Sequence, residues 1–210
     1  MSINNENYPA ELTIDYPDKL DKFTTFFRII VIIPIFILLA FLIGDPHNAE
    51  HAHKGWETIY EGGGIVFIPT LLMILFRGKY PKWWFDWNLA LTKFSYRIFS
   101  FLVLLRDEYP STDEEQAIHI HIPYPDAENT LLRGMPLVKW FLAIPHIIIL
   151  AFLYVAVVVC TIIAWFAIIF TGVYPRSMFD FVVGVLRWSL RVSAYAFLLT
   201  TDEYPPFSLT

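Results

Sequence analysis

Histidine and cysteine are the side chains of this sequence best suited to binding a metal ion or exchanging a proton at neutral pH. His119 and His121 alternate with isoleucine in a segment typical of a strand, so both rings would lie on one face. A second group lies in the polar stretch at residues 44–64, and its members are His47, His51 and His53. Neither group has a spacing that defines a complete ligand set. Exposed strand and loop residues are therefore the simpler interpretation, with metal binding as the alternative.

His146 follows Pro145 inside an apolar run and is the candidate for a polar site within a membrane. A lone histidine that hydrogen-bonds a neighbouring backbone carbonyl is the simpler interpretation. The sequence contains no nucleophile paired with a base, no pair of catalytic carboxylates, no phosphate-binding glycine loop and no HExxH motif. We therefore expect a protein that is not an enzyme and that uses no cofactor. Cys160 is the one cysteine, so no disulfide can form within a single chain.

Basic residues recur at helical spacing in two segments that are rich in aromatic residues. They are Lys93 with Arg97 in the first segment, and Arg187 with Arg191 in the second. Each segment predicts an amphipathic helix in the plane of the membrane, with its cations on lipid phosphates and its rings among the headgroups. The alternative is a third span whose arginines face the protein interior. Arg28 and Lys139 precede apolar runs at matching places, and we expect them to extend toward lipid phosphate as well.

Composition places the chain in a membrane. It has 210 residues, 56% of them hydrophobic and 18% aromatic, with a mean hydropathy of +0.51. These values exceed ordinary usage for a soluble domain, and several segments approach the roughly 20 apolar residues that a crossing needs. The net charge of -5 argues against a nucleic-acid partner. The polar N-terminal segment does not resemble a cleaved signal peptide, so the first apolar run would remain as an anchor.

Two halves of the chain, residues 1–112 and 113–210, repeat the same order of features. Each carries a strand-like segment, a basic residue with a proline in an apolar run, a Tyr-Pro dipeptide and an amphipathic segment. The predicted parts are hairpins at about residues 24–77 and 136–171, with amphipathic helices at about residues 81–105 and 175–200.

The fold class that we expect is an all-α integral membrane protein. It has two tandem repeats, each a transmembrane helical hairpin followed by an in-plane amphipathic helix, and a small cytoplasmic β element. Basic residues flank the hairpins, which indicates a multi-pass protein with both termini in the cytoplasm. In the second half the turn would fall near residues 155–161. One long helix over residues 137–170 is the alternative, favoured by the lack of Gly and Pro after Pro145. The strand-like segments AELTIDYP and QAIHIHIPYP could pair with each other or join a partner's sheet.

The motif Asp-Glu-Tyr-Pro ends each half, at residues 107–110 and 202–205. Proline stops a helix that precedes it, and tyrosine favours the membrane boundary. We interpret the motif as the end of each amphipathic helix. Its acidic residues would keep the chain in water where it leaves the helix. Ion pairs between these acids and the basic residues of the helix are a further option.

The segments KWFLAIPH, YPRSMFDFVVGVLRWSLRVSAYAFLL and DEYPPF resemble a bacterial membrane family described as domain of unknown function 4389. The resemblance is close in the second half and looser in the first. It implies a bacterial integral membrane protein, often with the unit in tandem, and it transfers no activity and no catalytic residue.

The functional hypothesis is a non-enzymatic protein of the bacterial inner membrane that organises lipid or serves as an accessory or assembling subunit. Its expected partners are membrane lipids, including anionic ones, together with further copies of itself or a larger complex. A small transporter or channel built from the duplicated unit is the first alternative. A metal-binding membrane sensor that uses the histidine groups is the second.

Overall fold

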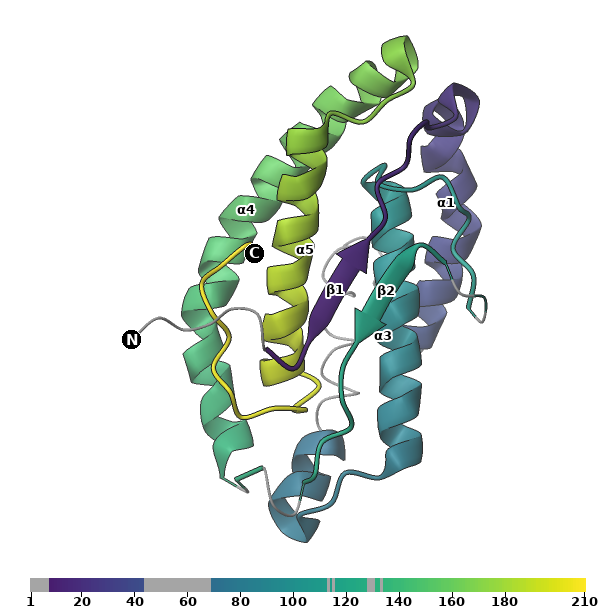
Figure 1. Ribbon diagram of the computed structural model, residues 1–210. Coiled ribbons are helices and arrows are strands. Elements are labelled where there is room, and N and C mark those ends of the chain that lie inside the picture. Colours follow the sequence, from purple (N-terminus) through teal and green to yellow (C-terminus); the bar gives the residue numbers. More distant parts are fainter. Residues whose placement is uncertain (1–7, 44–68, 113, 115, 128–130, 133) are drawn as a thin grey trace, which may run out of the picture.

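The computed structural model describes residues 8–43, 69–112, 114, 116–127, 131–132 and 134–210 (Figure 1). Within these residues the chain is mostly helical, with a small two-stranded sheet. The elements, in chain order, are β1 (Glu11–Ile14), α1 (Lys22–Ile43), the π-helical segment η3 (Met73–Arg77), α3 (Lys82–Leu102), β2 (Ile118–His121), α4 (Met135–Thr171) and α5 (Arg176–Ala196).

Helix α4 is continuous from Met135 to Thr171, a length of 37 residues or about 55 Å. Its apolar sequence contains no helix breaker after Pro145, and it ends at Gly172, whose φ of 78° reverses the chain. The hairpin predicted for residues 136–171 is therefore wrong, and the turn expected near residues 155–161 does not form. By length and composition, α4 is the one helix of the described part that could cross a membrane.

The two strands pair in antiparallel register, with Glu11 opposite His121 and Ile14 opposite Ile118. Each alternates between buried and exposed positions, as the sequence pattern predicts. The buried positions carry leucine and isoleucine, whereas the exposed ones are polar. The exposed residues are Glu11, Thr13, His119 and His121.

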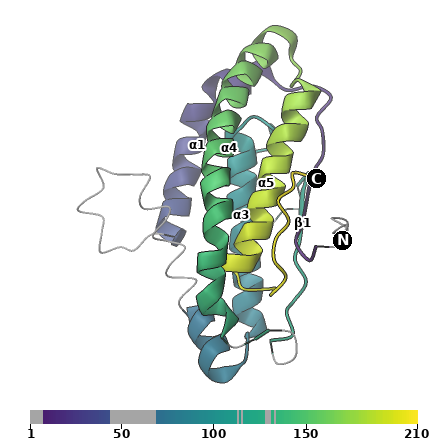
Figure 2. The same cartoon turned by 90° about the vertical axis from the view of Figure 1, so that its left-hand side faces the viewer.

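The sheet covers one side of the helices (Figures 1 and 2). Strand β1 packs on α5 and β2 packs on α3, while α4 packs on α5, and α1 packs on α3 and α4. In Figure 2 the sheet and α1 lie on opposite sides of the molecule. Strands and apolar helices thus enclose α5 between them.

Helix α5 is an interior helix. Along it, the exposed residues are Arg176, Ser177 and Asp180, all in its first turns. The lipid-facing position predicted for the helix at residues 175–200 is therefore wrong, because most of its surface is covered by the protein. A basic stripe on an otherwise apolar helix needs a polar partner, and the partner here is the strand and tail of the same chain.

Helix α4 has the opposite character. It buries one narrow stripe against α5, formed by Pro136, Lys139, Ala143, His146, Leu150, Val157, Ala164 and Ile168. Large apolar side chains on the rest of its surface are exposed along its whole length, from Leu137 to Phe170.

Candidate functional site

Lys139 is buried at the start of α4, with 0% of its surface exposed. Its Nζ lies 2.6 Å from Oδ1 of Asp202 and donates a 2.7 Å hydrogen bond to the Thr201 carbonyl oxygen. The Nζ also lies 5.2 Å from the centre of the Tyr195 ring. The other carboxylate oxygen of Asp202 accepts a hydrogen bond of 2.7 Å from the Leu132 N–H. The positive charge of Lys139 is thus matched by the negative charge of Asp202 inside the protein.

Arg28 on α1 has the same arrangement and is 2% exposed. Its guanidinium forms an ion pair with Asp107 and donates hydrogen bonds to the carbonyl oxygens of Phe101 (2.7 Å) and Arg106 (2.9 Å). It also lies 4.4 Å from the centre of the Phe101 ring. Asp107 in turn accepts a hydrogen bond of 2.6 Å from the Asp21 N–H.

These two pairs correct the predicted role of Arg28 and Lys139. Both cations are enclosed, so neither extends toward lipid phosphate. Their partners are the aspartates of the two Asp-Glu-Tyr-Pro motifs, which we had interpreted as helix ends in water or as partners of the basic stripe. Leu104 and Leu199, with φ of 68° and 55°, turn the chain before each motif. The aspartate can then reach the cation at the start of the apolar helix.

The basic stripe of α5 binds the backbone of its own chain. Arg187 donates hydrogen bonds to the carbonyl oxygens of Leu12 (3.1 Å) and Leu209 (3.4 Å). Arg191 is 5% exposed and donates to the oxygen of Thr210 at 2.7 Å. Burial, reinforced by the charge of Arg187, lowers the pKa of Arg191. Both arginines are therefore directed toward the backbone of their own chain, as the third-span alternative expected of them, although α5 is not a candidate span. Contact of these arginines with lipid phosphate stays a prediction.

In α3, Arg97 is 8% exposed and donates a 2.7 Å hydrogen bond to the Ser111 carbonyl oxygen. It too is directed into the protein rather than toward lipid. Lys93, one turn earlier, is half-buried. Trp83 and Trp87 on the same helix are exposed, so α3 retains an aromatic surface that α5 lacks.

His146 lies in the buried stripe of α4. Its Nδ1 accepts a 3.1 Å hydrogen bond from Nε1 of Trp188 on α5, and its ring stacks on Phe207 with centroids 3.9 Å apart. Tyr204 also contacts the ring, at 4.9 Å. The bond from Trp188 places the histidine proton on Nε2. The predicted hydrogen bond to a neighbouring backbone carbonyl does not form, and the partner of the ring is instead the Trp188 side chain of the next helix.

The two histidines of strand β2 have too few neighbouring ligands to form a metal centre among the residues that the structure describes. His119 and His121 are exposed on the same face as predicted, and Nε2 of His119 lies 3.4 Å from Asp15. No group of three histidine, cysteine, aspartate or glutamate side chains suited to a metal ion occurs among the described residues. His47, His51 and His53 lie outside the described residues.

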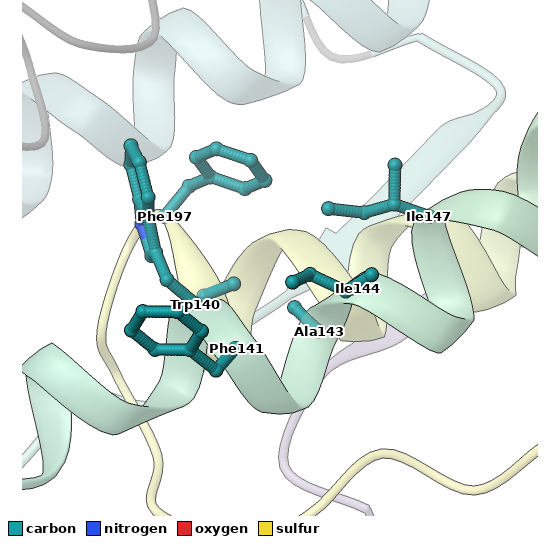
Figure 3. A pocket seen from close by; sticks show the side chains of 7 residues that line it. Trp140, Phe141, Ala143, Ile144, Ile147 and Phe197 are labelled. Carbon is teal, nitrogen blue, oxygen red and sulfur yellow. The ribbon is translucent and has the colours of Figure 1, made fainter.

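An apolar pocket of about 220 Å³ lies between the start of α4 and the end of α5 (Figure 3). It is lined by Trp140, Phe141, Ala143, Ile144, Ile147, Ala196 and Phe197. The lining is almost entirely apolar, so the pocket offers contact to hydrocarbon and almost no hydrogen bonds. Sequence reasoning did not predict it, because it requires α5 to return along α4.

The three sequence segments that resemble a known family lie in α4, in α5 and in the C-terminal segment that follows α5. The family described as Domain of unknown function (DUF4389) matches residues 135–208. No curated protein and no solved structure matches the chain. The match covers the whole of α4 and α5 and the second Asp-Glu-Tyr-Pro motif, including both partners of the Lys139–Asp202 pair. The resemblance seen in the sequence is therefore confirmed as a match to this family over residues 135–208.

Proposed function

We propose that this protein is a non-enzymatic scaffold of the bacterial inner membrane, which organises lipid or assembles with other membrane proteins. The observation that carries the proposal is the surface of α4. Its buried stripe faces α5, and the large side chains elsewhere on the helix are apolar and exposed, among them Phe141, Phe152 and Phe170 at 74%, 74% and 77%. Such a surface is stable in contact with acyl chains and unfavourable in contact with water.

The interior charges support a structural role. Arg28 and Lys139 hold the chain that follows the last helix of each half against the start of an apolar helix. Arg187 and Arg191 hold β1 and the C-terminal tail against α5. These cations therefore bind groups of their own chain. Such an arrangement is typical of a structural role rather than of a catalytic site.

We further propose that residues 1–112 and 113–210 are tandem copies of one unit. Contacts at corresponding positions support this. Tyr16 donates its hydroxyl to the Tyr174 carbonyl oxygen, and Tyr124 donates to that of Tyr80, so each half contacts the other in the same way. Further matched features are the ion pairs Arg28–Asp107 and Lys139–Asp202, the positive φ of Leu104 and Leu199, and the positive φ of Gly78 and Gly172.

The test is to purify the full chain from bacterial membranes in mild detergent and measure its mass and bound lipid by native mass spectrometry. We expect the protein to stay with the membrane through a carbonate wash. We also expect it to emerge as an oligomer, or with a partner, and to retain anionic phospholipid. A monomer that binds anionic and zwitterionic lipid equally would refute the scaffold. Release by carbonate would refute the membrane location.

A further inference from the structure

The apolar part of α4 is too long for an ordinary crossing. Residues 137–170 span about 51 Å at 1.5 Å per residue, whereas the hydrocarbon core of a bilayer is about 30 Å thick. Matching the two lengths by tilt alone would need an angle of about 54°, beyond the range of roughly 0–40° seen for membrane helices. Length therefore disfavours an upright α4.

The level of the sheet gives an independent argument. Tyr154, at the middle of α4, donates a 2.8 Å hydrogen bond to Ser189 of α5. Arg187, one half-turn earlier on α5, donates a 3.1 Å hydrogen bond to the Leu12 carbonyl oxygen in β1. The centres of α4, α5 and β1 therefore lie at one level along the helix axes, which Figure 1 also shows.

An upright molecule would consequently hold its sheet at the centre of the bilayer. The exposed side chains of Glu11, Thr13 and His121 would then face hydrocarbon. A charged side chain there costs about 2.5–3.5 kcal/mol by insertion scales. Open edges of a two-stranded sheet do not occur in contact with lipid either, because their backbone groups would lose water without gaining a partner.

Among the residues that the structure describes, the opposite side of the molecule exposes mainly apolar side chains. Helix α1 lies beside α4 and exposes Phe23, Phe26, Ile30, Val31, Ile33 and Ile37. Exposed cations stand at both ends of the helices, with Lys22 and Arg176 at one end and Arg77 and Lys82 at the other. Cations beside a long apolar face can pair with the anionic headgroups that surround acyl chains, although Asp18 and Asp21 are exposed at the first of these ends and Arg176 there already pairs with Asp180.

We propose that the protein lies flat along one leaflet, with the face formed by α1 and α4 in the acyl chains and the sheet in water. This inference rests on the proposed membrane location and deepens it by naming the bound surface as the acyl chains and anionic headgroups of a single leaflet.

The experiment measures the depth of three positions on α4 in the full chain. Phe141, Phe152 and Phe170 share one helical face, since 11 and 18 residues are close to whole numbers of turns. Each is replaced by cysteine in a Cys160→Ala background and spin-labelled in vesicles of phosphatidylglycerol and phosphatidylethanolamine. A label at Thr13, on the exposed face of the sheet, is the matched control. Collision rates with oxygen and with a water-soluble nickel chelate report depth.

We expect the three α4 labels to have the same acyl-chain depth within about 5 Å, and the Thr13 label to collide freely with the nickel chelate. The first and last labels are about 44 Å apart along the axis. An upright helix would therefore place Phe152 deep and the others near the headgroups, with Thr13 shielded. That result would overturn the flat orientation and keep the membrane location. Free access of nickel to all three α4 labels would overturn both.

Discussion

Asp202→Asn is the substitution that tests most directly how the buried cations are held. It keeps the shape of the side chain and an oxygen that can accept the hydrogen bond from the Leu132 N–H, but it removes the negative charge beside Lys139. The ammonium group, 0% exposed, then keeps the carbonyl oxygen of Thr201 and the ring of Tyr195 as partners.

The magnitude follows from burial. Removing one partner of a fully buried ion pair costs about 3–5 kcal/mol, because the remaining charge is left without compensation. Since 16% of the Asp202 side chain is exposed, water can reach the pair, and we expect the lower end, about 3 kcal/mol. For a chain of this size each kcal/mol corresponds to about 2–4 °C, so the apparent Tm should fall by about 6–12 °C.

The assay is thermal unfolding in detergent, followed by tryptophan fluorescence at one heating rate for all variants. Asp180→Asn is the matched control on α5, because its ion pair with Arg176 is exposed at 57% and 65%. An exposed pair of this kind contributes less than about 0.5 kcal/mol, so its Tm should change by less than about 2 °C. If Asp202→Asn and Asp180→Asn unfold at the same temperature, the reasoning about the buried pair is refuted.

Two further substitutions test the packing of the tail and the contact between the halves. Gly184→Ala would place a methyl group 2.8 Å from the Leu209 carbonyl oxygen. We expect a loss of about 1–3 kcal/mol and faster proteolysis of the C-terminal tail, and an unchanged cleavage rate would contradict that close approach. Tyr16→Phe removes the hydroxyl that donates a 2.5 Å hydrogen bond to the Tyr174 carbonyl oxygen. We expect a loss of about 1 kcal/mol in thermal unfolding, and a Tm equal to that of the unsubstituted protein would show that this contact adds nothing.

Local patterns predicted the elements well where polar and apolar residues alternate, or where a run of residues is uniformly apolar. The strands at Glu11–Ile14 and Ile118–His121 follow from strict alternation, and their pairing was among the arrangements expected. The hairpin in the second half was wrong because it was inferred from analogy with the first half and from the basic residues that flank it, neither of which fixes a turn inside the run. The local signal, a run without Gly or Pro after Pro145, favoured the single helix that forms.

The site was harder to predict because a cation has no preferred partner in a linear sequence. Arg28 and Lys139 could bind a lipid phosphate or a carboxylate with similar chemistry. Their partners, Asp107 and Asp202, lie beyond another helix in the sequence. Only the return of that helix along the first brings each aspartate to the cation, after a leucine with positive φ turns the chain.

The amino-acid sequence by itself determined which segments become helix or strand, and that the chain has a large apolar surface, because these depend on neighbours a few residues apart. Only the tertiary structure decided which polar groups the buried cations of α1 and α4 bind and where the stripe of α5 is directed. The tertiary structure also decided that the sheet lies beside the middle of α4. All of these features require contacts between elements that are far apart in the chain. The buried ion pairs depend on such contacts. Burying a cation costs free energy, and that cost is offset only when the fold brings a carboxylate or carbonyl oxygen within reach.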